Sequence, residues 1–562
     1  MAGVINVITK GPGNSRRALL GAEYGKYDAQ RCRAALSGPL VADRVFYSLE
    51  GQHVRRDGYF FNTFTQRDFD GRRNWAGNAR LKYVPSSRWS LGLNARAEWT
   101  KDLGIFPVAL NDTLARTNPY LVAFDAENID KRNVYSGSFD ARYFGSSVEL
   151  TAVTGYQRTA RGTGPGGTEA DLSPLPLATS TYDYHRDIWS QEIRVGSTRS
   201  RDRRLGWTVG AYGFHQRNPS LVDVFVDSLI SPFQQDFHNV TEDRTDVDGY
   251  AVFGQATVTV ADRLDLTFGM RYDKQTTTLH TKRDLHLQNG TTIPGQPTTI
   301  EAPSSAVSPK ASIAYRASDR VLAYATYARG YRAGGANLSG LTSPVPKTFD
   351  PEYINNYEIG VKASTSDRRV RVNLTGFYID WTDAQVTSFD FTTFVNATLN
   401  SGDVTSKGIE IELSALPVNR LQVDWNFGYT DAVYDKLNLS LNPQMPLDLS
   451  GNRPPLVPKV TSTLAPLVDI PIGRRNTSLS LRGEWRHLGK HYFDLQNTIV
   501  QEGYSLFGAT ATLRTRSFDL SAWGANLNRK VYFAYGFAFG ARYIMLGAPR
   551  TLGLTMMLRP WQ

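Results

Sequence analysis

The sequence is dominated by runs in which apolar and polar residues alternate with a period of two. The run 89–101 places Trp89, Leu91, Leu93, Ala95, Ala97 and Trp99 on one face and Ser90, Gly92, Asn94, Arg96, Glu98 and Thr100 on the other. Successive side chains of a β-strand point to opposite sides, so this run predicts a strand with one apolar face. The pattern returns at 263–273, 421–430 and 551–558. Because no helical period separates these runs, we expect an all-β chain.

The connections between the expected strands alternate in length. In 308–337, two strand-like runs flank a tight polar turn at 317–320, and the second run opens into the glycine-rich stretch 330–335. Similar short turns contain Asp43-Arg44, Ser87-Arg88, Asp262-Arg263, Asp319-Arg320, Asp367-Arg368 and Asn419-Arg420. Between them lie the longer connections 58–71, 103–130, 161–181, 218–245, 278–303, 331–351, 382–402, 435–458 and 531–549. A fixed alternation of this kind gathers the long loops on one side.

Together these features predict a transmembrane antiparallel β-barrel. The runs number about 22, a size associated with plugged outer-membrane transporters. Such barrels have short periplasmic turns and long extracellular loops, which places Met1 and Gln562 on the periplasmic side. Strand edges cannot remain unpaired in hydrocarbon, so we expect the first strand to pair with the last. Pro560, near the end, cannot donate to such a ladder.

Composition excludes other classes. Cys32 is the one cysteine, so an internal disulfide scaffold is excluded, and no apolar run approaches the roughly 18 residues of a membrane helix. The net charge of +10 is spread over turns and alternate strand positions instead of forming one basic stripe. We therefore expect no nucleic-acid partner and interpret the charge as a basic lumen or loop surface that faces anionic ligands or lipid phosphates.

The chain resembles the C-terminal β-barrel of a TonB-dependent outer-membrane receptor of the siderophore-receptor type. The resemblance rests on an ordered set of fragments in the second half: 308–310, Tyr315, 327–337, 351–352, 357–362, 377–381, 396–397, 408–410, 458–459, 526–527 and 549–551. The stretch 3–12, GVINVITKGP, resembles the last strand of that family's plug domain. We therefore expect residues 1–13 to be a plug remnant and 14–562 to be the barrel, in a chain truncated upstream and without a signal peptide.

The resemblance implies a function for the complete receptor. It would take up a scarce solute, a ferric siderophore, across the outer membrane of a Gram-negative bacterium. Energy would reach a plug through TonB and a TonB box, both expected upstream, and the barrel would be a monomer in outer-membrane lipid. The alternative is a plug-free passive channel like a porin. A soluble propeller is a third possibility, but it predicts a repeat of about 40 to 50 residues that the sequence lacks.

Chemical motifs give little support for an enzyme. The glycine-rich stretch 162–167 lacks the Lys-Ser/Thr of a phosphate loop, and no Ser-His-Asp arrangement can be defended. Glu410 and Glu412 share a strand face and are expected to line a wet lumen, and we expect no side-chain metal or cofactor site. His487 and His491 would lie too far apart on a strand to share an ion, and His491 is expected in a solvated loop.

Ligand capture is expected in the long loops. The stretch 531–541 is the least charged in the chain, and its aromatic residues Tyr532, Phe533, Tyr535, Phe537 and Phe539 could offer a surface to a planar or catecholate ligand. Tyr331 and Arg332, at the mouth of the hairpin, could meet an anionic ligand. The alternatives are that 531–541 extends the barrel wall or meets the plug and lipid headgroups, and that Tyr331 and Arg332 have a structural role in the glycine-rich turn.

Overall fold

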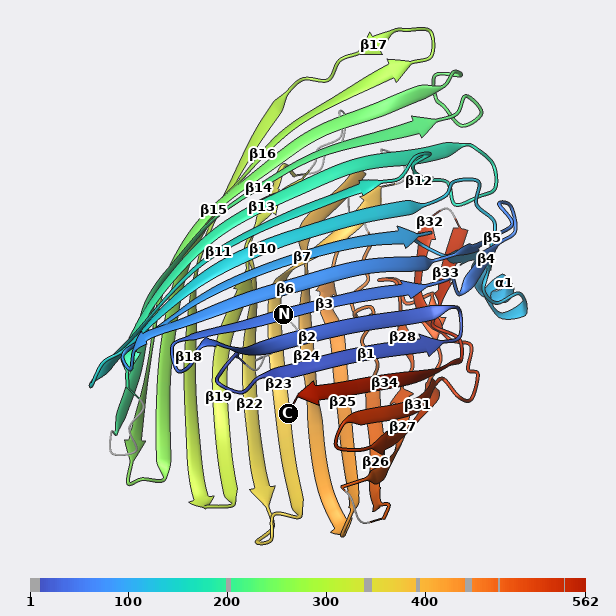
Figure 1. Ribbon diagram of the computed structural model, residues 1–562. Coiled ribbons are helices and arrows are strands. Elements are labelled where there is room, and N and C mark those ends of the chain that lie inside the picture. Colours follow the sequence, from blue (N-terminus) through green and yellow to red (C-terminus); the bar gives the residue numbers. More distant parts are fainter. Residues whose placement is uncertain are drawn as a thin grey trace.

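The computed structural model describes residues 11–198, 204–337, 346–390, 395–439, 447–473, 476–539 and 541–561. The expected plug remnant 1–13 lies mostly outside these residues, as does Gln562. Within them the main sheet has 24 strands, of which β12 and β17 are two-residue pieces that pair with β13 and β16, respectively. The other 22 strands form a closed antiparallel barrel, which confirms the predicted fold (Figure 1).

The wall strands follow the order of the chain, each pairing with its neighbours in sequence. They are β1 (Arg17–Gly25), β2 (Ala29–Val41), β3 (Val45–Arg56), β6 (Gly71–Ser86), β7 (Trp89–Leu103), β10 (Ile129–Phe144), β11 (Val148–Thr163), β13 (Ala178–Ser197), β14 (Leu205–Val226), β15 (Phe237–Val260), β16 (Leu264–Leu287), β18 (Thr298–Ser318), β19 (Val321–Arg332), β22 (Glu352–Ser364), β23 (Val370–Asp390), β24 (Val395–Val418), β25 (Leu421–Leu437), β26 (Val460–Pro471), β27 (Ser478–Leu488), β30 (Tyr504–Arg514), β31 (Phe518–Ala525) and β34 (Thr551–Trp561).

The barrel closes where β1 meets β34, in blue beside dark red in Figure 1. Seven residues of β1 pair with β34, from Ala18 with Trp561 to Gly25 with Gly553. The register shifts between Ala18 and Leu20, so Pro560 falls in the irregular step. The missing N–H of this proline therefore interrupts no regular pair of the ladder.

Alternation along the strands separates a lipid face from a lumen face. On β10, Tyr135 and Phe139 are exposed on the outward face together with Tyr143. On β7, Trp89, Leu93 and Trp99 share that face, with the tryptophans near its two ends. Charged residues on the inward face often neutralise each other two residues apart along one strand, as in Arg96 with Glu98 and Arg271 with Asp273.

The predicted short turns are confirmed. Asp43-Arg44, Ser87-Arg88 and the other four pairs all lie between consecutive wall strands at the periplasmic end. Several of their residues adopt a left-handed backbone, including Asp43 at φ 60°, Asp262 at φ 58° and Arg420 at φ 74°. Asp is tolerated in this region because its short side chain can bond to the local backbone.

The extracellular connections carry the remaining elements. These are β4 (Phe60–Asn62), β5 (Arg67–Phe69), β8 (Val108–Leu110), α1 (Asn111–Thr117), β9 (Leu121–Val122), β12 (Thr168–Glu169), β17 (Thr292–Ile293), β20 (Gly335–Ala336), β21 (Thr348–Phe349), β28 (His491–Tyr492), β29 (Val500–Gln501), β32 (Phe533–Phe539) and β33 (Ala541–Leu546). In the described parts of the chain, no helix has the length and apolar character needed to cross a membrane.

The loops differ from the prediction in two ways. The connections expected at 218–245, 278–303 and 382–402 are largely strand, because β14 to β16, β18, β23 and β24 continue beyond the apolar band. Beyond the lipid these strands no longer need an apolar outward face. Strand ends predicted from apolar–polar alternation therefore fall short of the ends in the structure. A further long connection, 489–503, follows β27 and was missed.

The described parts of the extracellular loops are largely folded. The rim cap, which we define as β4, β5, β8, α1, β9, β32 and β33, forms two small sheets with a shared apolar core (Figure 1). The members of that core include Phe60, Phe69, Val108, Val122, Phe124, Phe533 and Ile544. A second cluster joins the extracellular ends of β23, β24 and β25 around Val386, Val404 and Tyr434. A rigid mouth follows from this packing.

Replacing Phe139 with arginine tests the assignment of the lipid face. Phe139 lies midway between Tyr135 and Tyr143 on the outward face of β10, so Phe139→Arg would place a cation near the middle of the hydrocarbon. We expect the free energy of unfolding to fall by about 2–4 kcal/mol. Denaturant unfolding of the barrel in lipid vesicles measures this change.

Ser138→Arg is the matched control. Ser138 lies next to Phe139 on the lumen face, which it shares with Asp140. We expect a change within about 0.5 kcal/mol for this variant. Equal losses for the two arginines would contradict the assignment of the faces.

Candidate ligand-binding surface at the barrel mouth

The connection between β19 and β22 folds inward over the mouth. Its short hairpin of β20 and β21 packs against β18, and the Gly334 N–H donates to Ser304 Oγ at 3.0 Å. Gly334 and Gly335 permit this approach, because a Cβ at Gly334 would lie 2.3 Å from the carbonyl oxygen of Phe349. The inward faces of Ala302, Ser304 and Ala306 are buried as a result.

Beside this loop, the upper inner wall contains a recess of about 740 Å³. We call it the basic recess, since the inward faces of β10, β11 and β13 supply Arg132, Arg161 and Arg186 to it. Arg132 and Arg161 are direct cross-strand partners, and Tyr184 is the next partner of Arg161. Ala336, from the inward loop, lines the same recess.

One of these arginines is fixed by a buried carboxylate. Arg161 Nε donates to Asp130 Oδ1 at 2.8 Å, and the Tyr182 hydroxyl donates to the same oxygen at 2.6 Å. A phenol is protonated at neutral pH, so the Tyr182 hydroxyl remains a donor to this carboxylate. Among the described residues, Arg132 and Arg186 form no ion pair. Two arginines are therefore available to an anion.

The opposite side of the recess is formed by acceptors. Asp243 and Asn218, on β15 and β14, line it, and Oδ1 of each is buried without a hydrogen-bond partner among the described residues. Burial raises the pKa of Asp243. Buried oxygens of this kind are costly unless a donor reaches them. The recess therefore offers cations on one side and unsatisfied acceptors on the other.

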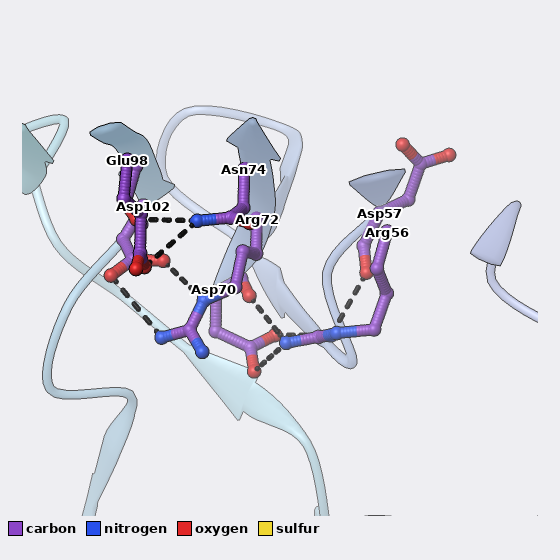
Figure 2. Close-up of polar contacts among 8 residues, drawn as sticks. Arg56, Asp57, Asp70, Arg72, Asn74, Glu98 and Asp102 are labelled. Atoms are coloured by element: carbon purple, nitrogen blue, oxygen red, sulfur yellow. Dashed lines mark hydrogen bonds and ion pairs between the residues drawn. The ribbon is translucent and has the colours of Figure 1, made fainter. Parts of the chain in front are cut away.

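A polar network continues this inner wall at the ends of β3, β6 and β7 (Figure 2). Arg72 Nε donates to Asp102 at 2.6 Å, and Arg56 contacts Asp70 at 3.1 Å. The side-chain amide of Asn74 donates to Glu98 and to Thr100 at 3.1 Å and 2.8 Å. The inward charges here are matched by partners, so this part of the wall is structural.

Tyr331 and Arg332 lie at the base of the inward loop. Arg332 Nε contacts Glu352 Oε1 at 3.0 Å, and Glu352 is 4 % exposed. The backbone N–H of Gln385 donates to the same carboxylate at 2.6 Å. Arg332 thus ties the loop to the wall, and a ligand contact at either residue stays a prediction.

The aromatic stretch 531–541 belongs to the rim cap. Phe533 is fully buried in its core beneath the guanidinium of Arg116, 4.3 Å from the ring centroid, so its side chain packs loops together. Tyr532 stacks on Tyr504 and Phe537 on Tyr543, while Tyr535 is 36 % exposed. The side chain of Phe539 lies outside the described residues. Ligand binding by this stretch stays a prediction, and the structure does not join it to Tyr331 and Arg332.

The expectation that His491 is solvated is wrong. His491 is 5 % exposed, and Nδ1 lies 2.9 Å from the carbonyl oxygen of Gly489. His487 instead contacts Ser505 Oγ on the neighbouring strand β30. The described residues contain no group of three or more His, Cys, Asp or Glu arranged to hold a metal ion.

Three carboxyl groups meet where two rim loops touch. Glu169 of β12 lies beside Asp125 and Asp171, and its Oε2 accepts the Ala126 N–H at 3.4 Å. Asn128 Oδ1 accepts the backbone N–H of Glu169. Burial, followed by hydrogen bonds with Asp171 and Asp125, raises the pKa of Glu169 to about 9. A neutral Glu169 therefore joins the loops near neutral pH.

A closed 22-strand barrel with short turns at one end, folded loops at the other and a charged recess below them is the architecture of an outer-membrane receptor. Residues 12–527 match the family described as TonB dependent receptor-like, beta-barrel. The chain belongs to this family. Its members are outer-membrane proteins of Gram-negative bacteria that interact with TonB.

Two curated relatives are similar over most of the chain. The pesticin receptor of Yersinia pestis is 23% identical over 571 residues, covering 98% of this chain and 77% of the relative. The metal-pseudopaline receptor CntO of Pseudomonas aeruginosa is 24% identical over 77% of this chain and 61% of that receptor. Both are receptors by name.

Solved structures share the fold. The ferric yersiniabactin uptake receptor FyuA from Yersinia pestis has a TM-score of 0.85 at 20% identity, covering 99% of this chain and 82% of that one. The siderophore receptor PiuA from Acinetobacter baumannii has a TM-score of 0.78 at 15% identity, covering 98% and 82%. These likenesses establish the architecture of the barrel.

The carboxyl group of Glu169 should make the loop junction sensitive to pH. A raised pKa means that the folded loops hold a proton that the open loops release, so the stabilisation is complete below about pH 4.5 and is lost as the pH rises towards about 9. Glu169→Gln should remove this dependence. Hydrogen exchange at the Ala126 amide, corrected for the intrinsic rate, measures the junction between about pH 6 and pH 9.5.

Glu127→Gln is the control on the same loop. Glu127 is exposed and contacts Arg67 at 3.5 Å, so its loss should leave the pH dependence unchanged. An unaltered pH dependence in Glu169→Gln would show that another group is responsible.

Proposed function

We propose that this barrel captures a metal chelate of the siderophore class at its extracellular mouth and that TonB energises its import. Family membership supports the dependence on TonB. The relatives are named as receptors, and two of the solved structures are named for ferric or siderophore uptake. The metal would be cargo held by the chelator, with no catalytic step and no resident cofactor.

The basic recess is the observation that carries the proposal. Arg132 and Arg186 are unpaired among the described residues and face a volume of about 740 Å³, which suits a small chelate. Guanidinium groups bind carboxylate and phenolate oxygens through charge-assisted hydrogen bonds, and Tyr184 adds an aromatic surface. Asp243 and Asn218 would accept hydrogen bonds from hydroxyl or amine groups of the same ligand.

Removing the two unpaired arginines should weaken capture. Arg132→Gln combined with Arg186→Gln is expected to reduce the affinity for an anionic ferric tricatecholate by at least about ten-fold, since each hydrogen bond to a charged group contributes about 1.5–3 kcal/mol. Quenching of tryptophan fluorescence in the purified protein measures the affinity. A cationic ferric trihydroxamate is the comparison ligand and should not lose affinity.

Arg329→Gln provides a control that removes an arginine elsewhere on the extracellular half, where its guanidinium lies over Tyr353. Its affinity for the ferric tricatecholate should equal that of the wild type.

Uptake of iron-55 chelate, with the protein expressed from its native locus in cells with and without TonB, tests the energised step. Uptake that persists without TonB, together with a steady single-channel conductance, would favour the passive channel and overturn the proposal.

A further inference from the structure

The outward face of the barrel carries four cations in one cross-strand row. Arg55 on β3 pairs with Arg73 on β6, Arg73 with Lys101 on β7, and Lys101 with Lys131 on β10. All four lie near the extracellular ends of their strands. We call these residues the outer cation row. Neighbouring strands are about 4.8 Å apart, so the row spans about 14 Å.

The aromatic residues beneath the row establish that it faces outward. Arg73 is two residues from Trp75, and Lys101 is two residues from Trp99, so each pair shares a face. Trp75 is 58% exposed and Trp99 44%, and the indole N–H of Trp99 donates to the Tyr135 hydroxyl at 3.0 Å. Such residues mark the interface between hydrocarbon and headgroups, and the cations lie just beyond it.

Of the four cations, only Arg55 has carboxylate partners among the described residues. Arg55 contacts Asp28 at 3.1 Å and Asp57 at 3.5 Å. Within the described residues, the side chains of Arg73, Lys101 and Lys131 make no hydrogen bond and no ion pair. Like charges directly opposite each other on neighbouring strands are destabilising, so three adjacent uncompensated cations require an external anion.

The residues adjacent to the outer cation row in sequence form a second cross-strand row on the inward face, and there the positive charges are matched by carboxylates. On the inward face, Arg56, Arg72, Asp102 and Asp130 are consecutive cross-strand partners. Two cations there are matched by two carboxylates, and Arg72 contacts Asp102 at 2.6 Å (Figure 2). The imbalance therefore belongs to the outward face alone, where the partner would come from the surroundings.

A shallow apolar groove of about 780 Å³ runs beneath the aromatic residues on the same outward face. Its floor is a row of small residues, Ala34, Gly51, Gly77 and Ala97, which are consecutive cross-strand partners. Leu49 and Trp99 border it. Small residues in a wall that otherwise projects large apolar side chains leave an apolar channel along the outer surface.

We propose that the outer cation row and this groove form a binding site for a phosphorylated, multiply acylated glycolipid of the outer leaflet, the lipid A part of lipopolysaccharide. The row would bind its phosphates, and the groove would hold an acyl chain. The three unpaired cations span about 10 Å and carry more positive charge than one phosphate neutralises, which favours a headgroup with two. The extracellular position selects the outer leaflet. The site is independent of whether the protein imports a chelate.

Native mass spectrometry of the full chain, delipidated in detergent and titrated with hexa-acylated diphosphoryl lipid A, tests the proposal. Wild type should retain the lipid, and Arg73→Gln combined with Lys101→Gln should bind it at least about ten-fold more weakly. Dephosphorylated lipid A and phosphatidylglycerol should both bind wild type more weakly than diphosphoryl lipid A. Millimolar inorganic phosphate should not displace the bound lipid, because it lacks the acyl chains.

Two further variants keep the test decisive. Arg80→Gln combined with Lys82→Gln removes two cations from the lumen face of β6 and should bind as wild type. Ala97→Phe should weaken binding with the charges intact, because its ring would fill the groove. Resistance of each unheated variant to SDS shows that the barrel is folded. Equal retention by the Arg73/Lys101 variant and wild type, or equal binding of dephosphorylated lipid, would overturn the proposal.

Discussion

The hydrogen-bond requirement of strand edges in hydrocarbon is the constraint on which the whole structure depends. An open edge would leave N–H and C=O groups without water, so the sheet must return to its first strand. The chain meets this requirement with seven paired residues between β1 and β34, and it places Pro560 where the register already shifts. In a closed barrel, every side chain of the wall faces either the lipid or the lumen, because successive side chains of a strand point to opposite sides.

The second consequence concerns the mouth. Wall strands such as β15 and β16 continue past the apolar band, so the loops begin from tall, hydrogen-bonded hairpins. The rim cap then buries Phe124, Phe533 and Ile544 as a small soluble domain would, and Glu352 anchors the inward loop through Arg332 and Gln385. The recess is therefore preformed, and a preformed site lowers the entropic cost of binding for a ligand of the kind proposed above.

Period and turn chemistry were sufficient to predict the barrel, the closure and the short turns. They failed outside the lipid, where a strand no longer needs an apolar outward face. The extension of β16 to Leu287 therefore leaves no apolar–polar alternation in the sequence. They also failed for the recess, because Arg132, Arg161 and Arg186 are 54 residues apart at most and come together only through the register of β10, β11 and β13. The aromatic, uncharged composition of 531–541 instead predicted a ligand-binding surface there. In the structure, Phe533 of this stretch is buried in the core of the rim cap.

The pairing register of neighbouring strands could have revealed the basic recess. Three basic dipeptides lie at extracellular strand ends: Arg55-Arg56, Arg72-Arg73 and Lys131-Arg132. In linear sequence each looks like a patch of doubled charge. A strand separates the two residues onto opposite faces, so Arg56 and Arg72 join the balanced inner network and Arg132 enters the basic recess. Their neighbours Arg55, Arg73 and Lys131 face the membrane surface. Each dipeptide thus places one cation on each side of the barrel wall.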